Sequence, residues 1–190
     1  MESNQVIFLN GVSSSGKSTL AQALQRRLEK PYLHISEDMF FAALPAREFA
    51  QADYLRYGWR LYNGFTQCVR TLAQCQNHVI VDTVAWNPGS LEGFIDALWE
   101  LQVFAVGVHC PLAVLEAREQ QRQDRSMGLA RRQFDLAHQG ALYDVEVDTS
   151  QMEIEACADL IAAALDSAPS PHAFARMKER LQANSAQQPK

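Results

Sequence analysis

The feature that most constrains this chain is a loop with the pattern G-x-x-x-x-G-K-S, which runs from Gly11 to Ser18. The apolar run 6–9 precedes the loop, and a helical pattern begins at about Lys17. A strand, such a loop and a helix together favour a phosphate site, because the free N–H groups and the dipole at a helix start attract anions. The alternative is a Gly/Ser-rich turn followed by a surface lysine. We expect a site for a nucleoside triphosphate.

Individual loop residues have expected tasks in such a site. Gly11 and Gly16 allow the backbone to curl until successive N–H groups point inward. Lys17 is placed to reach the outer phosphates, and the hydroxyl of Ser18 is placed to bind Mg²⁺. The loop therefore predicts a triphosphate together with a magnesium ion.

Size, charge and cysteine usage limit the class of protein. The 190 residues fit one domain with a core of its own, and the net charge of −5 argues against nucleic acid or an anionic membrane as a general partner. The sequence shows neither a signal-type segment nor a run of the roughly eighteen apolar residues that a membrane span needs. Its four cysteines form no C-x-x-C pair. We expect a cytoplasmic protein with buried thiols, and a homo-oligomer is left open.

Short apolar runs alternate with helical patterns along the chain, which is typical of an α/β fold with a parallel sheet and helices on both faces. The five predicted strands are 6–10, 32–35, 78–82, 103–109 and 145–148. Helices are expected from about 17, from 38, and over 47–76, 88–101, 111–123, 128–138 and 151–165. Right-handed crossovers would place the ligands at the carboxyl ends of the strands. This layout predicts a P-loop kinase.

The chain divides into two expected parts. Residues 1–166 form the predicted kinase domain, with a helical lid at about 118–132. The proline-containing segment 166–171 interrupts the alternation of strands and helices. We interpret residues 167–190 as a C-terminal extension, with a short basic surface helix over 171–183 and a polar tail.

A second element of the phosphate site is the apolar strand that closes on Asp82. In P-loop folds an acid at this strand end lies beside the loop and holds Mg²⁺, directly or through water. An aspartate that caps the following turn would occupy the same position, so both interpretations stay open.

Two acids, Glu37 and Asp38, follow the second predicted strand, where a phosphoryl acceptor would lie. Transfer to a hydroxyl needs a carboxylate that accepts the proton and aligns the oxygen with the γ-phosphate. We choose Asp38 for this task, because it lies in the first turn of a helix directly after the strand. Glu37 is interpreted as a solvated acid at the helix start. A helix-capping role is the alternative for Asp38.

Three arginines of the predicted lid, Arg118, Arg122 and Arg125, share one helix face at positions i, i+4 and i+7. Guanidinium groups this close repel one another unless anions compensate them, and a phosphate-rich ligand would do so. Glu119 and Asp124 could instead pair with them in a solvated ion network. We interpret the segment as a lid that closes over phosphates.

The chain also resembles a known family in several blocks. These blocks are Leu9–Ser18, the Asp38 segment that ends at Leu44-Pro45, the positions Gly107-Val-His-Cys110, Arg118-Glu119, Arg122, Asp124-Arg125, Gly128, His138 and Gly140, and the stretch Tyr143-Asp-Val-Glu-Val-Asp-Thr149. They look like the chloramphenicol phosphotransferase family over nearly the whole chain to about Leu165.

This resemblance implies a P-loop kinase that moves the γ-phosphate of ATP onto a hydroxyl of a small antibiotic. It implies that Asp38 is the base and that the lid arginines contact phosphate. Mg²⁺ is expected at Ser18 and Asp82. The implied ATP contacts are Gly11, Val12, Ser13, Ser14, Ser15, Gly16, Lys17, Ser18 and Thr19.

The segment 40–75 matches the family poorly and carries its own aromatic set. Its members are Phe41, Tyr54, Tyr57, Trp59, Tyr62 and Phe65. Such a set is more often helix-packing core than the wall of a ligand pocket, although Trp86 makes a mixed role plausible. The acceptor therefore stays open between an antibiotic and the hydroxyl of a nucleoside, a nucleotide-sugar or another metabolite. A nucleotide-binding switch without an acceptor is the rival from another class, and the two acids at 37–38 argue against it.

Overall fold

The computed structural model describes residues 5–45, 51–121, 128–167 and 172–187, and of residues 51–56 and 185–187 it describes the backbone. Within these ranges the chain forms one five-stranded sheet in which all paired strands are parallel. The strands are β1 (Gln5–Asn10), β2 (Tyr32–Ser36), β3 (His78–Thr83), β4 (Gln102–His109) and β5 (Val145–Asp148). The predicted five-stranded parallel sheet is confirmed.

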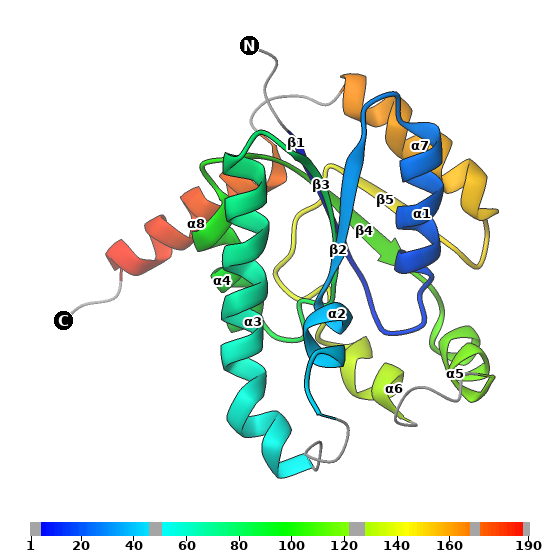
Figure 1. The fold of residues 1–190 in the computed structure, drawn as a ribbon, viewed down its shortest axis with the longest axis horizontal. Helices are drawn as coiled ribbons and strands as arrows, with labels where there is room; N and C mark the ends of the chain where they lie inside the picture. Colours follow the sequence, from blue (N-terminus) through cyan, green and yellow to red (C-terminus); the bar gives the residue numbers. More distant parts are fainter. Residues whose placement is uncertain (1–4, 46–50, 122–127, 168–171, 188–190) are drawn as a thin grey trace.

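Helices cover both faces of the sheet and line its carboxyl edge (Figure 1). On one face lie α1 (Lys17–Arg27) and α7 (Ile154–Ser167), and on the other lie α3 (Gln51–Gln74), α4 (Pro88–Leu98) and α8 (Ala173–Gln187). Three short helices, α2 (Glu37–Ala42), α5 (Leu112–Gln120) and α6 (Leu129–Phe134), gather where the strands end (Figure 1). Their position encloses that edge, where ligands bind in open parallel sheets.

The order of the strands is β2-β3-β1-β4-β5, so β1 lies in the centre. Its side chains alternate between two cores. Val6 and Phe8 face α3, α4 and α8, whereas Ile7 and Leu9 face α1 and α7. Because both faces are covered, β1 is a continuous apolar run rather than an alternating one. The loop therefore follows the central strand, which is buried on both faces of the sheet.

The aromatic set of segment 40–75 divides between core and surface. Tyr62 and Phe65 are buried, and each packs edge-to-face on Phe94 of α4. Trp59 is 54% exposed and stacks on Tyr62. The interpretation as helix-packing core is confirmed for Tyr62 and Phe65, and the side chain of Tyr54 lies outside the described residues.

Helix α8 belongs to the core, and the expected surface helix was wrong for its first turns. Phe174 is 1% exposed and contacts Phe8 at a ring distance of 4.9 Å, and Met177 is buried beside it. The buried carboxylate of Asp144 accepts hydrogen bonds from the N–H groups of Ala105 and Ala173, both at 2.8 Å, and so ties α8 to β4. The expectation of a surface helix rested on its basic residues and did not consider the apolar side chains between them, which are buried. The division of the chain at residue 166 stays a prediction.

The four cysteines have no disulfide bond, and only two of them are fully buried. Cys110 and Cys157 lie in the interior, Cys68 is partly exposed and Cys75 is exposed. The expectation of buried thiols was therefore wrong for Cys75. Within the described ranges, none of the helices has the length and apolar character that crossing a bilayer requires.

Candidate active site

The glycine-bounded loop connects the end of β1 to α1 and forms one wall of a pocket. Gly16 precedes α1 with a φ of 93°, a left-handed conformation that favours glycine, and Ser14 adopts a φ of 67°. A serine in this region is strained, and such strain is found mostly at functional sites. Ser15 N–H donates to Val12 O at 3.1 Å, which closes the loop on itself. The backbone therefore curls as the pattern predicted.

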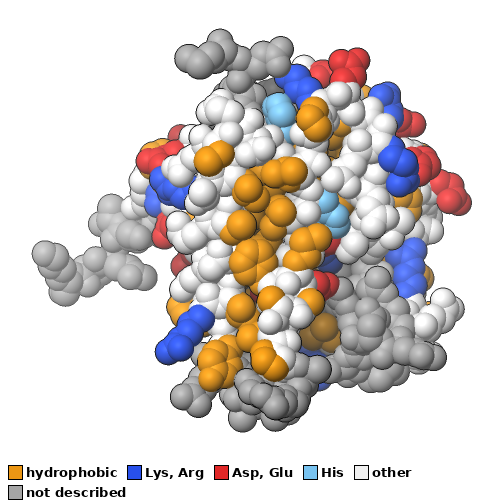
Figure 2. All heavy atoms as spheres, in the orientation of Figure 1, with side chains coloured by type: hydrophobic (Ala, Val, Ile, Leu, Met, Phe, Trp, Pro, Cys, Tyr) orange, Lys and Arg blue, Asp and Glu red, His pale blue; other side chains and the backbone are white. Residues whose placement is uncertain are grey.

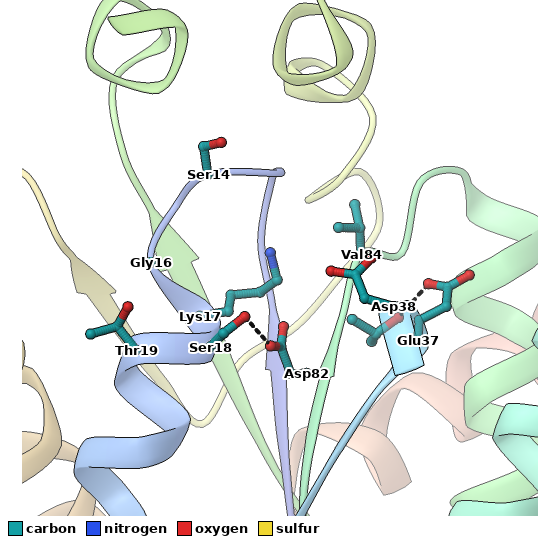
Figure 3. Close-up of a pocket in the computed structure, with 10 residues that line it drawn as sticks. Ser14, Gly16, Lys17, Ser18, Thr19, Glu37, Asp38, Asp82 and Val84 are labelled. Atoms are coloured by element: carbon teal, nitrogen blue, oxygen red, sulfur yellow. Dashed lines mark hydrogen bonds between the residues drawn. The ribbon is translucent and has the colours of Figure 1, made fainter. Parts of the chain in front are cut away.

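Lys17 and Ser18 begin α1 and turn toward the interior of the loop. The Lys17 side chain is largely buried, and its Nζ donates to the carbonyl of Val12 at 3.0 Å. Ser18 Oγ donates to Asp82 Oδ2 at 2.6 Å (Figure 3). Asp82 lies next to Leu9 in the β1–β3 register, so the sheet itself brings the acid to the loop. The two sequence elements of the phosphate site thus meet.

The environment of Asp82 favours its ionised form. Burial acts to raise the pKa of this carboxyl, but the hydrogen bond from His34 at 3.4 Å, the charge of Lys17 and the hydrogen bond from Ser18 hold the pKa below its usual value. A hydroxyl and a carboxylate are oxygen ligands of the kind that Mg²⁺ prefers. The described residues include no cluster of three or more acids, histidines or cysteines suited to a metal. Nucleotide-bound Mg²⁺ needs none, because phosphates and water complete its shell.

The two acids of α2 have different surroundings. Asp38 is exposed, and Figure 3 shows its carboxylate facing the loop and Lys17 across the pocket. Glu37 points away from the loop and accepts a hydrogen bond from Thr83 Oγ1 at 3.0 Å (Figure 3). Ser36 occupies the N-cap position of α2. The helix-capping alternative for Asp38 was therefore wrong.

Glu37 is partly buried, so its interpretation as a solvated acid was also wrong. Burial raises the pKa of Glu37 to about 7, although the hydrogen bond from Thr83 acts in the opposite direction. The nearby charges of Asp38 and Asp82 also raise this pKa, while Lys17 lowers it. A carboxyl that is partly protonated at neutral pH thus lies beside an exposed one.

The pocket joins the loop, the start of α2 and the end of β3. Residues that line it are Ser14, Gly16, Lys17, Ser18, Thr19, Glu37, Asp38, Asp82, Thr83 and Val84. The predicted residues Ser14, Gly16, Lys17, Ser18, Thr19, Asp38 and Asp82 are therefore brought together. Gly11, Val12, Ser13 and Ser15 belong to the same loop but do not line this pocket.

Arg118 is the lid arginine that the structure describes, and it lies against the loop. Its guanidinium donates to Thr149 Oγ1 at 3.0 Å, to Thr149 O at 2.9 Å and to Ser14 O at 3.4 Å. Thr149 Oγ1 in turn donates to Ser15 O at 2.7 Å. Arg118 thus joins α5 to the loop and to the turn after β5.

The other predicted lid residues, Arg122, Arg125 and Asp124, lie outside the described residues. Glu119 is buried and accepts hydrogen bonds from the N–H groups of Gly128 and Ala130, at 2.8 and 3.1 Å. It therefore holds the start of α6 and is not the solvated acid that the ion-network alternative requires.

Sequence reasoning missed two residues that touch the loop. Gln133 Oε1 accepts from the N–H of Ser13 at 2.9 Å, and Thr149 holds both Ser15 and Arg118. Thr149 closes a sequence block that resembled the family, so a signal for it existed. A lone glutamine in a helix has no comparable signature.

The strand order and a phosphate loop after the central strand define the fold of a P-loop kinase. Solved structures agree. The APS kinase of Mycobacterium tuberculosis, in complex with AMPPNP and APS, superposes with a TM-score of 0.68 at 17% identity, over 87% of this chain and 99% of that chain. A gluconokinase from Sinorhizobium meliloti 1021 superposes with a TM-score of 0.59 at 20% identity, over 97% of this chain and 99% of that chain.

The family model described as chloramphenicol phosphotransferase-like protein matches residues 4–166, and the chain belongs to this family. Two curated Mycobacterium tuberculosis proteins that are named O-phosphotransferases are each 29% identical over 207 residues, covering 95% of this chain and 90% of the relative. Family and fold together make the chain a phosphotransferase.

Proposed function

We propose that the chain is an ATP- and Mg²⁺-dependent O-phosphotransferase that phosphorylates a hydroxyl of a small molecule, with chloramphenicol or a similar antibiotic as the first acceptor to test. The observation that supports this most is the position of Asp38, whose carboxylate faces Lys17 and the loop across the pocket (Figure 3). We expect the enzyme to work in the cytoplasm, with no nucleic acid or membrane as partner.

The donor side of the proposed reaction is the loop. The amides of 11–19 and the ammonium of Lys17 hold the phosphates, and Ser18 and Asp82 hold Mg²⁺. When bound, Mg²⁺ neutralises charge on the β- and γ-phosphates. A buried and ionised Asp82 favours such a cation, because a carboxylate removed from water is stabilised by a positive charge beside it.

The acceptor side is Asp38. Its carboxylate aligns the acceptor hydroxyl and takes its proton, while the acceptor oxygen forms a bond to the γ-phosphorus and the bond to the β–γ bridging oxygen breaks. Arg118, together with Arg122 and Arg125, stabilises the charge that develops on the transferring group. The reaction then depends mainly on positioning and charge.

The test is a panel of hydroxylated compounds, with chloramphenicol in the first set, followed by ADP release and by ³¹P spectra of the products. Once an acceptor is found, Asp38→Asn should lower turnover by about 10²-fold or more while the Kd for nucleotide changes little. Asp96→Asn is the matched control, because Asp96 is an exposed aspartate on α4 that pairs with Lys178. Unchanged turnover in Asp38→Asn would contradict the base assignment.

The remaining outcomes separate the rival functions. A phosphorylated nucleoside, nucleotide-sugar or other metabolite would retain the reaction and change the acceptor. Binding and slow hydrolysis of ATP without a phosphorylated product from any compound would favour a nucleotide-dependent switch.

A further inference from the structure

Asn10, the last residue of β1, is completely buried and uses both ends of its side-chain amide. Its Oδ1 accepts from the N–H of Ala85, at 2.8 Å, in the segment after β3. Its Nδ2 donates to the carbonyl of Ala137 at 2.6 Å and to the hydroxyl of Tyr143 at 2.7 Å. One side chain next to the phosphate loop thus connects the end of β1 to the segment after β3 and to residues 137–143, all far apart in the sequence.

The hydroxyl of Tyr143 is in contact with His138 as well as with Asn10. This hydroxyl accepts from Asn10 Nδ2 and forms a second hydrogen bond with His138 Nδ1, at 2.7 Å. Burial and the charges of His109 and Lys17 lower the pKa of His138 to about 4, so its ring is neutral at neutral pH and one of its two nitrogens is an acceptor. The His138 ring also stacks on His109 at 4.2 Å.

Close packing keeps Tyr143 in this position. Its ring lies directly over Gly107 of β4, where a Cβ would approach the ring carbons to 2.7 Å. Glycine at this position therefore allows the ring to cover the strand and the hydroxyl to reach Asn10. The stated contacts form one continuous chain from the end of β1 to the segment after α6.

The same segment touches the phosphate loop directly. Ala137 N–H donates to Gln133 O at 2.9 Å, so the residue that Asn10 holds is bonded to the end of α6. Gln133 Oε1 accepts from the N–H of Ser13 at 2.9 Å. An apolar cluster adds to this contact, and its buried members are Val12, Cys110, Leu115, Ala130 and Ala137. The end of α6 is therefore docked on the loop by polar and apolar contacts.

We propose that Asn10 is a positioning residue for the phosphate loop, which it serves by holding the end of α6, and with it Gln133, against Ser13. The inference rests on the proposed function, in which the loop amides bind nucleotide phosphates. Loss of the connection removes the Gln133 contact at Ser13, so the loop amides that follow Ser13 are less well oriented toward the phosphates and nucleotide binding weakens. A purely architectural asparagine would affect the free energy of unfolding and leave nucleotide affinity unchanged.

The mildest test is Tyr143→Phe, which removes the hydroxyl shared by Asn10 and His138 and leaves the ring on Gly107. We expect it to raise the Kd for a fluorescent ATP analogue with Mg²⁺ by about tenfold, because two buried hydrogen bonds of the connection are lost. Tyr32→Phe is the matched control. It removes a hydroxyl that donates to Gln5 Oε1 at 2.9 Å, at the opposite end of the strands, and should leave this Kd within about twofold.

A conservative pair sharpens the test at His138. Asn places a carbonyl oxygen near the position of Nδ1, so His138→Asn should bind the analogue within about threefold of the wild type, whereas His138→Leu should resemble Tyr143→Phe. Thermal unfolding of all variants shows whether differences in Kd follow stability. If Tyr143→Phe binds the analogue as tightly as Tyr32→Phe, the proposal is wrong and the proposed function is unaffected.

Hydrogen exchange keeps the two proposals separate. If the wild-type chain binds no nucleotide, the proposed function fails. Faster exchange over residues 129–137 in Tyr143→Phe, but not in Tyr32→Phe, would then still support the docking of α6 by Asn10. Equal exchange in the two variants would overturn it.

Discussion

The two walls of the pocket are built in different ways. The loop wall comes from one continuous stretch in which Ser13, Ser14, Ser15 and Lys17 are buried, and Ser18 next to them is bonded to the buried Asp82. The opposite wall begins with α2, a six-residue helix without a fully buried residue, and its Asp38 is exposed. The loop is thus held by more buried contacts than α2 is. Under the proposed function, we therefore expect substitutions in the loop to change nucleotide affinity and substitutions in α2 to change the use of the acceptor.

The largest expected effect is on the loop wall. Lys17→Met removes the buried ammonium beside the Val12 carbonyl and should weaken binding of Mg²⁺ and an ATP analogue by a hundredfold or more, because charge-assisted hydrogen bonds to phosphate are lost. Isothermal titration measures this change. Nucleotide binding of wild-type strength in this variant would contradict the proposal that Lys17 and the loop bind the phosphates.

A smaller effect is expected where the sheet meets the loop. Asp82→Asn keeps an oxygen for Ser18 but removes the negative charge, so the concentration of Mg²⁺ needed for half-maximal nucleotide binding should rise by at least about tenfold. A magnesium titration at fixed nucleotide concentration checks this. An unchanged requirement for Mg²⁺ would show that Asp82 is structural.

The third expected effect is on turnover and concerns Arg118, which lies in neither wall of the pocket. Arg118→Lys loses the two-point contact with Thr149 and should lower turnover by about tenfold. The matched control is Arg131→Lys, because Arg131 is exposed and pairs with Glu116. Equal turnover in the two variants would contradict the proposed role of Arg118 in stabilising charge on the transferring group.

The smallest effect on binding and turnover is expected at Glu37, which instead affects the pH dependence of stability. The pKa of Glu37 is raised in the folded state to about 7, so the folded protein binds more protons than the unfolded chain between about pH 4.5 and 7. The free energy of unfolding should therefore fall as the pH rises through this window, by up to about 3 kcal/mol from this group. Urea titrations at pH 5 and pH 8 measure the difference, which should be smaller in Glu37→Gln. An identical pH dependence in the variant would contradict the raised pKa.

Local patterns predicted most of the fold. The strand 145–148 has the predicted bounds, and β3 extends only one residue beyond the predicted 78–82. Strand β3 is recognisable because burial on both faces requires a continuous apolar run, whereas the edge strand β5 alternates valines with acids. The loop was predictable because its glycines, Lys17 and Ser18 all lie within eight consecutive residues, so their pattern can be seen without knowledge of the fold.

Tertiary structure alone decided which distant residues complete the site. Gln133 meets Ser13 across 120 positions, and Asn10 meets Ala137 across 127, so no local spacing marks them. Burial of Glu37 and of Phe174 likewise depends on elements that pack from elsewhere in the chain. The sheet, the phosphate loop and the position of Asp38 at a strand end could be predicted, because they follow from short-range periodicity and backbone geometry. Packing decided which acid faces the loop and which segment holds that loop in place, because those contacts exist only once the sheet has brought remote residues together.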